Sequence, residues 1–324
     1  MDGTPVESGV VHVLLAASPG GHLTQLVNLR DRLPFDIGEA TWFTADTPQS
    51  RSMLRGERVV FADPAPPRDW RAVLTNRRLA SAACRRFGFN AAVSTGASMA
   101  LSALPVARLH GADAFYIESA ARVNGPSLSG RLLTRFPGVR TYCQYESWSD
   151  STWRFAGSVF DCFEPGPVRA DLQIDRAVVT LGSQEGYPFD RLVVRLVEIM
   201  PEGVEVLWQT GATNTASLGI DGLASVPASV LEDAMAVSEV VIAHAGVGSA
   251  LSSLLAGRHP VLVPRRSSLG EHVDDHQFQI AGELAERGLV TTCSPEELTL
   301  EVLQDAARRS TVRSTNPPPL TLGR

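Results

Sequence analysis

The sequence predicts an α/β protein built from two doubly wound domains in series. Short apolar runs typical of strands alternate with helical patterns along most of the 324 residues. The first run, residues 11–18, ends at the glycine turn 20–21, and Leu23, Leu26 and Val27 then recur at helical spacing. A strand, a glycine turn and a helix open a βαβ unit, and repeating that unit gives a parallel sheet with helices on both faces.

A break in this alternation separates the two predicted domains. Residues 164–176 are rich in proline, glycine and charge, as is common in a linker. We therefore expect domains at 1–163 and 177–309, and a disordered tail at 310–324 because it is rich in proline and threonine. Two such domains would face a central cleft along the carboxyl ends of their strands, where ligands of open α/β sheets bind.

The composition excludes several classes of function. Hydrophobic residues make up 44% of the chain, which indicates a full core, and the net charge of −6 argues against a nucleic-acid partner. All 29 basic residues are arginine, so no lysine is present to form a Schiff base or a P-loop. No apolar stretch reaches the roughly 18 residues of a membrane span, and residues 1–9 are too polar for a signal peptide. We expect a cytoplasmic protein with reduced cysteines at positions 84, 143, 162 and 293.

The strongest local signal is a glycine turn at residues 244–249. A predicted strand ends at His244, and Gly246, Gly248 and Ser249 then open a helix. Glycines let the backbone approach a bound anion, and the free N–H groups of a helix start point toward it. A diphosphate would fit this turn without a cation, whereas a turn needed only for packing is the alternative.

A polar run follows the next predicted strand, over residues 267–277. Its functional groups are Glu271, His272, Asp274, Asp275, His276 and Gln277. Two histidines four residues apart with carboxylates suggest a metal site, but such a pair needs a continuous helix and the H-E-x-x-H pattern is absent. We therefore expect no metal here, and interpret the run as a rim of donors and acceptors for ribose and sugar hydroxyls.

These motifs together resemble the C-terminal domain of glycosyltransferase family 28. The resemblance is carried by H-A-G-x-G-S at 244–249, residues 257–266, G-E-H-x-x-D-H-Q at 270–277, and the strand and glycine turn around residue 182. It implies the GT-B fold and a UDP-sugar donor, with the glycine turns around the diphosphate and the polar run facing the sugar. The donor-binding residues that it implies are Gly182, Ser183, Gln184, Gln209, Gly211, His244, Gly246, Gly248, Ser249, Arg265, Glu271, His272, Asp275, His276 and Gln277.

One position departs from the family pattern. Many relatives carry an acidic residue that grips the ribose hydroxyls in the helix after the H-A-G turn, and this chain has Ser252 there. The departure puts the ribose contact and the nucleotide preference in doubt.

The N-terminal half resembles the membrane-docking subunit of the transferase that adds the second N-acetylglucosamine to dolichol diphosphate, and the C-terminal half resembles its donor subunit. A-S-P-G-G-H-L-T-Q-L at 17–26 and S-T-G-A-S at 94–98 carry the first likeness. It implies acceptor-binding residues at Gly20, Gly21, Glu118, Ser119 and Arg122. A structural ion pair is the alternative for Glu118 and Arg122.

His22 is the candidate catalytic residue. It follows the glycine turn 20–21, where a neutral imidazole could accept the proton of an acceptor hydroxyl. A helix N-cap or a contact to the acceptor diphosphate are the alternatives.

The predicted reaction is inverting transfer without metal or other cofactor. Helix starts at 182–183 and 248–249, with Arg265 and Arg266, would stabilise the departing UDP. The resemblance implies a polyprenyl-diphosphate-linked saccharide acceptor at the inner face of the membrane, as in bacterial exopolysaccharide synthesis. An anionic membrane surface could bind a group of arginines and apolar residues, namely Arg68, Arg71, Arg77, Arg78, Arg85 and Arg86 beside Trp70, Val73 and Leu74.

Two other functions compete with this hypothesis. A nucleotide-sugar 2-epimerase would use the same fold and donor site without a lipid acceptor. A non-catalytic protein that senses UDP-sugars or recruits an enzyme is the second alternative, and Ser252 is its best argument. A dinucleotide dehydrogenase is disfavoured because neither first strand is followed by G-x-G-x-x-G.

Overall fold

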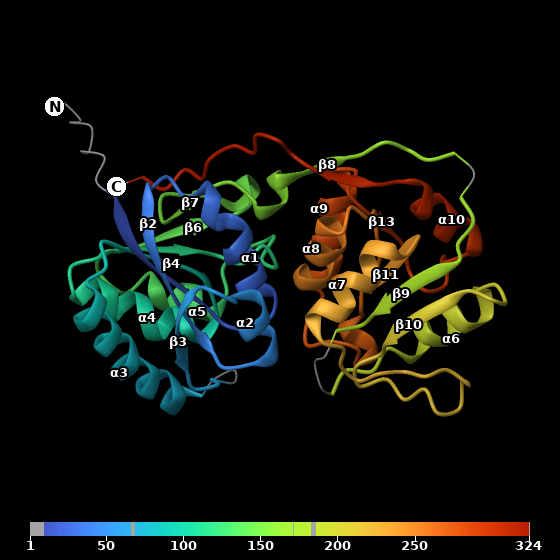
Figure 1. The fold of residues 1–324 in the computed structure, drawn as a ribbon, viewed down its shortest axis with the longest axis horizontal. Helices are drawn as coiled ribbons and strands as arrows, with labels where there is room; N and C mark the ends of the chain where they lie inside the picture. The colour runs from blue at the N-terminus through green and yellow to red at the C-terminus, as the bar shows by residue number, and fades with distance from the viewer. Residues whose placement is uncertain (1–9, 66–68, 171, 183–185, 324) are drawn as a thin grey trace. The chain divides into compact units, whose positions relative to one another are not determined.

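A computed structural model describes residues 10–65, 69–170, 172–182 and 186–323. The chain forms two compact units: residues 1–119, 124–159 and 318–324 make the first, and residues 120–123 and 160–317 make the second. Both units are α/β, as the sequence predicts, and each is described here by itself (Figure 1).

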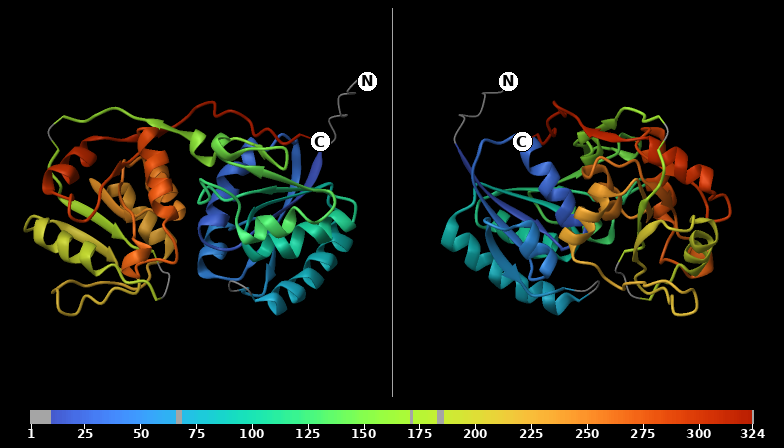
Figure 2. Two further views of the ribbon diagram at one scale, coloured as in Figure 1. Left: turned by 180° about the vertical axis from the view of Figure 1, so that it is seen from behind. Right: turned by 45° about the vertical axis from the view of Figure 1, so that its right-hand side comes forward.

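The first unit is built on a seven-stranded sheet in the order β3-β2-β1-β4-β5-β6-β7, whose pairings are all parallel. Its strands are β1 (Val11–Ala17), β2 (Ile37–Ala45), β3 (Arg58–Ala62), β4 (Ala91–Gly96), β5 (Asp113–Ile117), β6 (Val139–Cys143) and β7 (Trp153–Phe155). Its helices are α1 (Gly21–Leu29), α2 (Pro48–Met53), α3 (Trp70–Phe87), α4 (Ala97–Leu109) and α5 (Leu128–Leu133), with 3₁₀ turns at Arg30–Arg32 and Glu146–Trp148. Helices α3 and α4 pack side by side against this sheet (Figures 1 and 2).

Apolar side chains on both faces of the central strand β1 explain why this sheet is covered on both sides. Residues Val13 to Ala17 are fully buried, as expected for a parallel strand between two helical layers. Leu14 and Ala16 belong to a core cluster with α3 and α4, whose members include Ala80 and Leu104. The strands and helices of the first unit therefore pack together around a shared apolar core.

The second unit has a parallel five-stranded sheet in the order β10-β9-β11-β12-β13. Its strands are β9 (Arg176–Thr180), β10 (Glu205–Gln209), β11 (Val240–His244), β12 (Val261–Val263) and β13 (Thr291–Thr292). Its helices are α6 (Asp190–Ile199), α7 (Ala228–Val237), α8 (Val247–Leu255), α9 (His276–Glu286) and α10 (Leu300–Arg308), with 3₁₀ turns at Val159–Cys162 and Ser267–Leu269. Strand β9 lies in the middle, between β10 and β11, so the ends of these three strands meet at one edge.

The C-terminal segment differs from the disordered tail that its composition suggests. Strand β14 (Thr311–Arg313) pairs antiparallel with β8 (Phe163–Pro165), which begins the predicted linker. Farther along, the backbone N–H of Leu320 donates to the carbonyl of Arg32, and the Tyr142 hydroxyl donates to the carbonyl of Gly323.

Two alternating leucines explain the ordered end. Leu320 and Leu322 are 2% and 7% exposed, and they are spaced so that an extended chain presents both to the first unit. The Arg32 guanidinium, itself buried, donates to the carbonyls of Ser158 and Pro318. The proline-rich composition of the segment masks this short apolar pattern. Figure 2 shows the C-terminal segment ending beside the first unit.

Candidate functional site

Three glycine turns meet at the carboxyl edge of the second sheet. Gly182, Gly211 and Gly246 follow β9, β10 and β11, which are neighbours in the sheet. A Cβ on Gly211 would lie 2.6 Å from the carbonyl oxygen of Gly182, and one on Gly182 would lie 2.9 Å from Cε1 of His244. Gly182 and Gly211 also have positive φ angles, of 74° and 60°. Only glycine fits these contacts, so the three turns present bare backbone at one place.

His244 lies beneath these turns in its neutral form. Its Nδ1 is 3.3 Å from the carbonyl oxygen of Thr180, and because a carbonyl only accepts, Nδ1 carries the proton. Burial, followed by the nearby Arg265 charge, lowers the pKa of His244 to about 3. The imidazole therefore adds no charge to the edge at neutral pH.

Helix α8 starts at this edge with an uncapped first turn. Its N-cap is Gly246, no side chain caps it, and no acidic residue lies in its first turn. The first N–H groups of a helix lack partners within the helix and carry partial positive charge. Gly248 and Ser249 belong to this first turn, so the predicted anion site at 244–249 has the expected local structure. Ser252 lies one turn farther along the helix and is half-buried.

Arg265 brings a buried positive charge to the same turns. Its side chain is 1% exposed, and Nη2 donates to the carbonyl of Leu181 at 2.9 Å, immediately before Gly182. The guanidinium carbon lies 5.5 Å from the centre of the Phe189 ring. Within the described residues, its Nε has no hydrogen-bond partner. Burial lowers the pKa of Arg265, which is the cost of a cation held away from water. This unmet donor and charge are suited to an anion.

The polar loop 267–277 is held in place by three of its own residues. Glu271 accepts from Arg191 at 2.5 and 3.0 Å and from the backbone N–H of Arg266. Asp275 accepts from the N–H of Ser267, and Gln277 accepts from the N–H of Arg265. Glu271 and Gln277 are buried, so they support the loop from behind.

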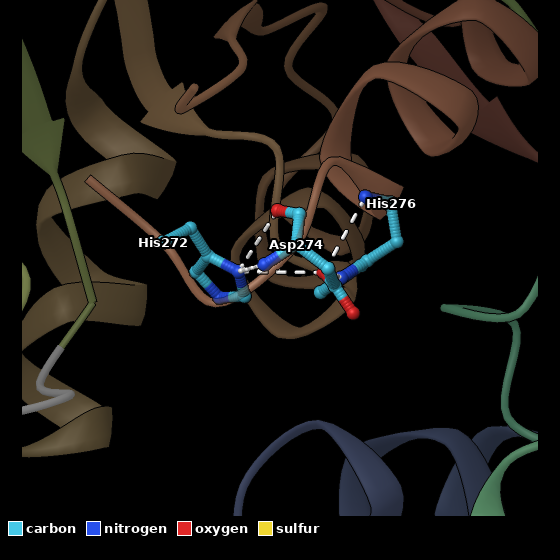
Figure 3. A group of neighbouring side chains, drawn as sticks. All are labelled: His272, Asp274 and His276. Carbon is cyan, nitrogen blue, oxygen red and sulfur yellow. Dashed lines mark hydrogen bonds and ion pairs between the residues drawn. The ribbon is translucent and has the colours of Figure 1, made fainter. Parts of the chain in front are cut away.

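The alternate residues of this loop converge on its other side. His272, Asp274 and His276 place one ligand atom each within 4.8 Å of one another (Figure 3). Nδ1 of His276 is hydrogen-bonded to Asp274, and the ring of Tyr187 lies against that of His272, with centroids 5.5 Å apart. Burial, then the charge of His276, lowers the pKa of His272. These three groups are the polar rim beside the glycine turns.

The predicted donor residue Gln209 makes a structural contact. Gln209 is buried, and its side-chain oxygen accepts from the Thr180 hydroxyl at 2.5 Å, so it ties β10 to β9. Ser183 and Gln184 lie outside the described residues.

His22 is anchored at the carboxyl edge of the first sheet. Its Nδ1 lies 2.8 Å from the carbonyl oxygen of Thr95, while the Thr95 hydroxyl donates to the carbonyl of His22. Nδ1 therefore carries the proton and Nε2 the lone pair that a general base needs. The N-cap of α1 is Gly20, with φ of 88°, so His22 is not the helix cap. A Cβ on Gly96 would lie 2.8 Å from Cε1 of His22. The glycine of S-T-G-A-S therefore leaves the space that the imidazole occupies.

Glu118 is a fully bonded structural carboxylate. It is 1% exposed and accepts from the Tyr116 hydroxyl, the N–H of Ser119, and both the N–H and the hydroxyl of Ser127, at 2.8 to 3.0 Å. These bonds fold the loop between β5 and α5. Arg122 belongs to residues 120–123, which group with the second unit.

Sequence reasoning missed a buried amide network near His22. Gln25 donates to the hydroxyl of Ser119, and Gln144 donates to Gln25 and to the carbonyl of Glu118. Ser119 and Gln144 follow strand ends, whereas Gln25 lies within α1, so no local pattern in the sequence links the three.

Across the described residues, no helix is both long and apolar enough to cross a bilayer.

Comparison with known proteins finds a family match within the second unit. Residues 176–317 match the glycosyltransferase family 28 C-terminal domain. The UDP-N-acetylglucosamine transferase subunit ALG13 of Saccharomyces cerevisiae is 44% identical over 63 residues, 19% of this chain and 29% of that protein. The UDP-N-acetylglucosamine--N-acetylmuramyl-(pentapeptide) pyrophosphoryl-undecaprenol N-acetylglucosamine transferase of Rhodospirillum centenum is 30% identical over 154 residues, 44% of this chain and 39% of that protein. The chain thus matches well under half the length of either relative.

The fold of the whole chain is that of GT-B glycosyltransferases. The crystal structure of Acinetobacter baumannii MurG matches 90% of this chain and 88% of its own, with a TM-score of 0.54 and 19% sequence identity. This likeness confirms the predicted fold class.

Proposed function

We propose that the chain is an inverting glycosyltransferase that works without a metal, because residues 176–317 match the glycosyltransferase family 28 C-terminal domain. It moves a sugar from a UDP-sugar to a polyprenyl-diphosphate-linked saccharide in the synthesis of a cell-surface polysaccharide. The observation that carries the proposal is the group of glycine turns beside a buried, incompletely bonded Arg265 in this domain. The names of the two curated relatives, both N-acetylglucosamine transferases, support the choice of a nucleotide-sugar donor and, for the bacterial one, a lipid-linked acceptor.

In this proposal the second unit binds the donor and stabilises the leaving group. The bare backbone at Gly182 and Gly246 admits the diphosphate, and the uncapped start of α8 donates N–H groups to it. Arg265 supplies the fixed positive charge that a metal ion supplies in other enzymes. The charge is already in place before reaction, so little reorganisation opposes the departure of UDP.

His22 is the proposed general base. Its Nε2 lone pair accepts the proton of the acceptor hydroxyl as the hydroxyl oxygen bonds to the anomeric carbon. The bond from that carbon to the diphosphate oxygen breaks, and UDP leaves with the electron pair. One direct displacement of this kind inverts the anomeric centre.

An anionic membrane surface is the proposed location of the acceptor. On α3, Arg71, Leu74, Arg78 and Arg85 are exposed and spaced to lie along one face, with exposed Trp70 at the start of the helix. A stripe of arginines with apolar side chains suits anionic lipid headgroups at the inner face of the membrane. Val73 is buried and belongs to the core, and Arg68 lies outside the described residues.

Calorimetry with UDP and a panel of UDP-sugars, in the presence of EDTA, tests the donor site. We expect metal-free binding of UDP with one sugar preferred. Gly182→Ala should weaken UDP binding at least about tenfold, because its Cβ meets His244 and narrows the turn. Gly203→Ala is the matched control, since Gly203 also has a positive φ but no atom near its Cβ.

The outcome separates the proposal from its alternatives. Absence of uridine nucleotide binding in the wild-type protein would overturn the proposed donor. Release of an epimerised UDP-sugar without an acceptor would favour the 2-epimerase. Binding of UDP-sugars with no transfer to a polyprenyl-diphosphate saccharide, in vesicles that contain it, would favour a sensing or recruiting role.

A further inference from the structure

The rim loop brings together the ligand set of a transition-metal site. His272 and His276 offer imidazole nitrogens and Asp274 offers a carboxylate oxygen, and the three atoms lie within 4.8 Å of one another (Figure 3). Nδ1 of His272 is 3.5 Å from Oδ1 of Asp274. In a tetrahedral site with bonds of about 2.0–2.2 Å, neighbouring ligand atoms lie about 3.3 Å apart. The three groups are therefore close to the spacing that one small ion requires.

The flanking residues fix this arrangement before any ion binds. Glu271 is paired with Arg191, Asp275 accepts from Ser267, and Gln277 accepts from the N–H of Arg265. Every second residue of the loop is thus tied to the scaffold or, like Val273 at 68% exposure, points to solvent. The ring of Tyr187 lies along His272 and limits its rotation. Such support from neighbouring residues is what distinguishes an organised ligand set from a chance group.

We propose that His272, Asp274 and His276 form a binding site for a divalent transition ion of the Zn²⁺ class. Two imidazoles and one carboxylate match the preferences of zinc, and three protein ligands leave open positions for water. Asp274 is the most accessible of the three, with its side chain 40% exposed against 8% for His272. Its Oδ2 lies 3.6 Å from Nη1 of Arg122, so Oδ1, which faces both histidines, is the oxygen that would hold the ion. Entry of the ion replaces the hydrogen bond between His276 and Asp274, with the ring proton of His276 held on Nε2.

The two histidines come together without the continuous helix that such a pair was expected to need. A pair of histidines four residues apart converges on a continuous helix, but here only His276 is helical, at the first position of α9. The bends of residues 271–275 bring the rings to a centroid distance of 4.9 Å instead.

An ion at this place would inhibit the proposed transfer. This consequence rests on the proposed function, because the same three side chains form the polar rim assigned to the donor sugar. Zinc would then weaken the binding of UDP-sugars while acting less on UDP, which lacks the sugar.

Binding of Zn²⁺ and Co²⁺ to the chelator-treated protein tests the site without any assay of activity. We expect one Zn²⁺ per chain by calorimetry, and Co²⁺ absorption bands in the visible region that Zn²⁺ removes. His272→Ala, His276→Ala and Asp274→Asn should each weaken Zn²⁺ binding at least about tenfold, since even loss of a supporting residue typically costs that much. His110→Ala, at an exposed histidine in the first unit, is the control and should bind Zn²⁺ as the wild type does.

The failures of the two proposals are distinguishable. Circular dichroism confirms that each variant is folded, and Asp274→Asn keeps the size of the side chain. Absence of Zn²⁺ binding, or equal binding by wild type and all three variants, overturns the metal site whatever the protein's activity. Zn²⁺ binding that needs the three residues supports the site even if no UDP-sugar binds.

Discussion

The most deeply buried charged side chains of the two units, among the described residues, have opposite signs. In the first unit the anion is Glu118, which accepts four hydrogen bonds from Tyr116, Ser119 and Ser127. In the second the cation is Arg265, whose Nε has no partner within the described residues. Both side chains are 1% exposed, so burial does not distinguish them.

What distinguishes them is whether their hydrogen-bonding capacity is filled. A buried polar group without partners costs free energy, so each one in a folded protein calls for an explanation, and a bound anion is one for a guanidinium. Glu118 is complete and organises a loop, whereas Arg265 has capacity left for an anion. The comparison therefore supports the proposed binding role of the Arg265 guanidinium and predicts a structural role for the Glu118 carboxylate.

The largest expected effect separates turnover from donor affinity. His22→Ala should lower kcat by about 10²–10⁴-fold, because it removes the proposed base, and should leave UDP affinity unchanged because the donor residues lie in the second unit. Steady-state kinetics and calorimetry on the same preparation measure both, with His110→Ala as the control. An unchanged kcat would remove His22 from the mechanism.

The next effect tests the unfilled capacity of Arg265. Arg265→Met should weaken UDP binding by about 10- to 150-fold, the equivalent of a charged hydrogen bond of about 1.5–3 kcal/mol, without changing the affinity for uridine. Stability should not fall, since the substitution removes a buried charge. Arg309→Met, at an exposed arginine that caps the C-terminal end of α10, is the matched control. Equal loss for uridine and UDP would contradict a diphosphate contact.

For Glu118 we expect the opposite result, a loss of stability without a loss of UDP affinity. Glu118→Gln replaces one acceptor oxygen with an NH2 group that faces the N–H of either Ser119 or Ser127, and should lower the free energy of unfolding by about 1–3 kcal/mol. Urea unfolding measures this, and exposed Glu146→Gln is the control. If Glu118→Gln left the stability unchanged but abolished transfer to the acceptor, Glu118 would be an acceptor-binding residue instead.

The smallest expected effect is a loss of stability at acid pH. Burial lowers the pKa of His244 to about 3 and that of His259 to about 4, both below the ordinary value of 6.5. Between those values the unfolded chain binds more protons, so stability falls as the pH drops below 6.5, by about 1.4 kcal/mol per pH unit for each histidine. His259→Gln should reduce this slope in the second unit, followed by hydrogen exchange of β11 and α8 between pH 6.5 and 5.5. An unchanged slope would show that His259 protonates in the folded state.

Prediction from sequence succeeded where the signal is local. The glycine turns at 182 and 246 and the strands before them follow from neighbouring residues, and so does the fold class. The roles of individual polar residues depend on partners far along the chain. Glu271 is held by Arg191, 80 residues earlier, and this pairing turns a predicted sugar contact into a support for the loop. Nothing near Glu271 in the sequence indicates it.

The docked C-terminus has a consequence for synthesis of the chain. Residues 318–324 complete the first unit, and residues 160–317 form most of the second. During synthesis, the first unit cannot bury Leu320 and Leu322 until residues 160–317 have been translated. The second unit is in effect an insertion within the first, so the core of the first unit is completed only after the second unit has been made.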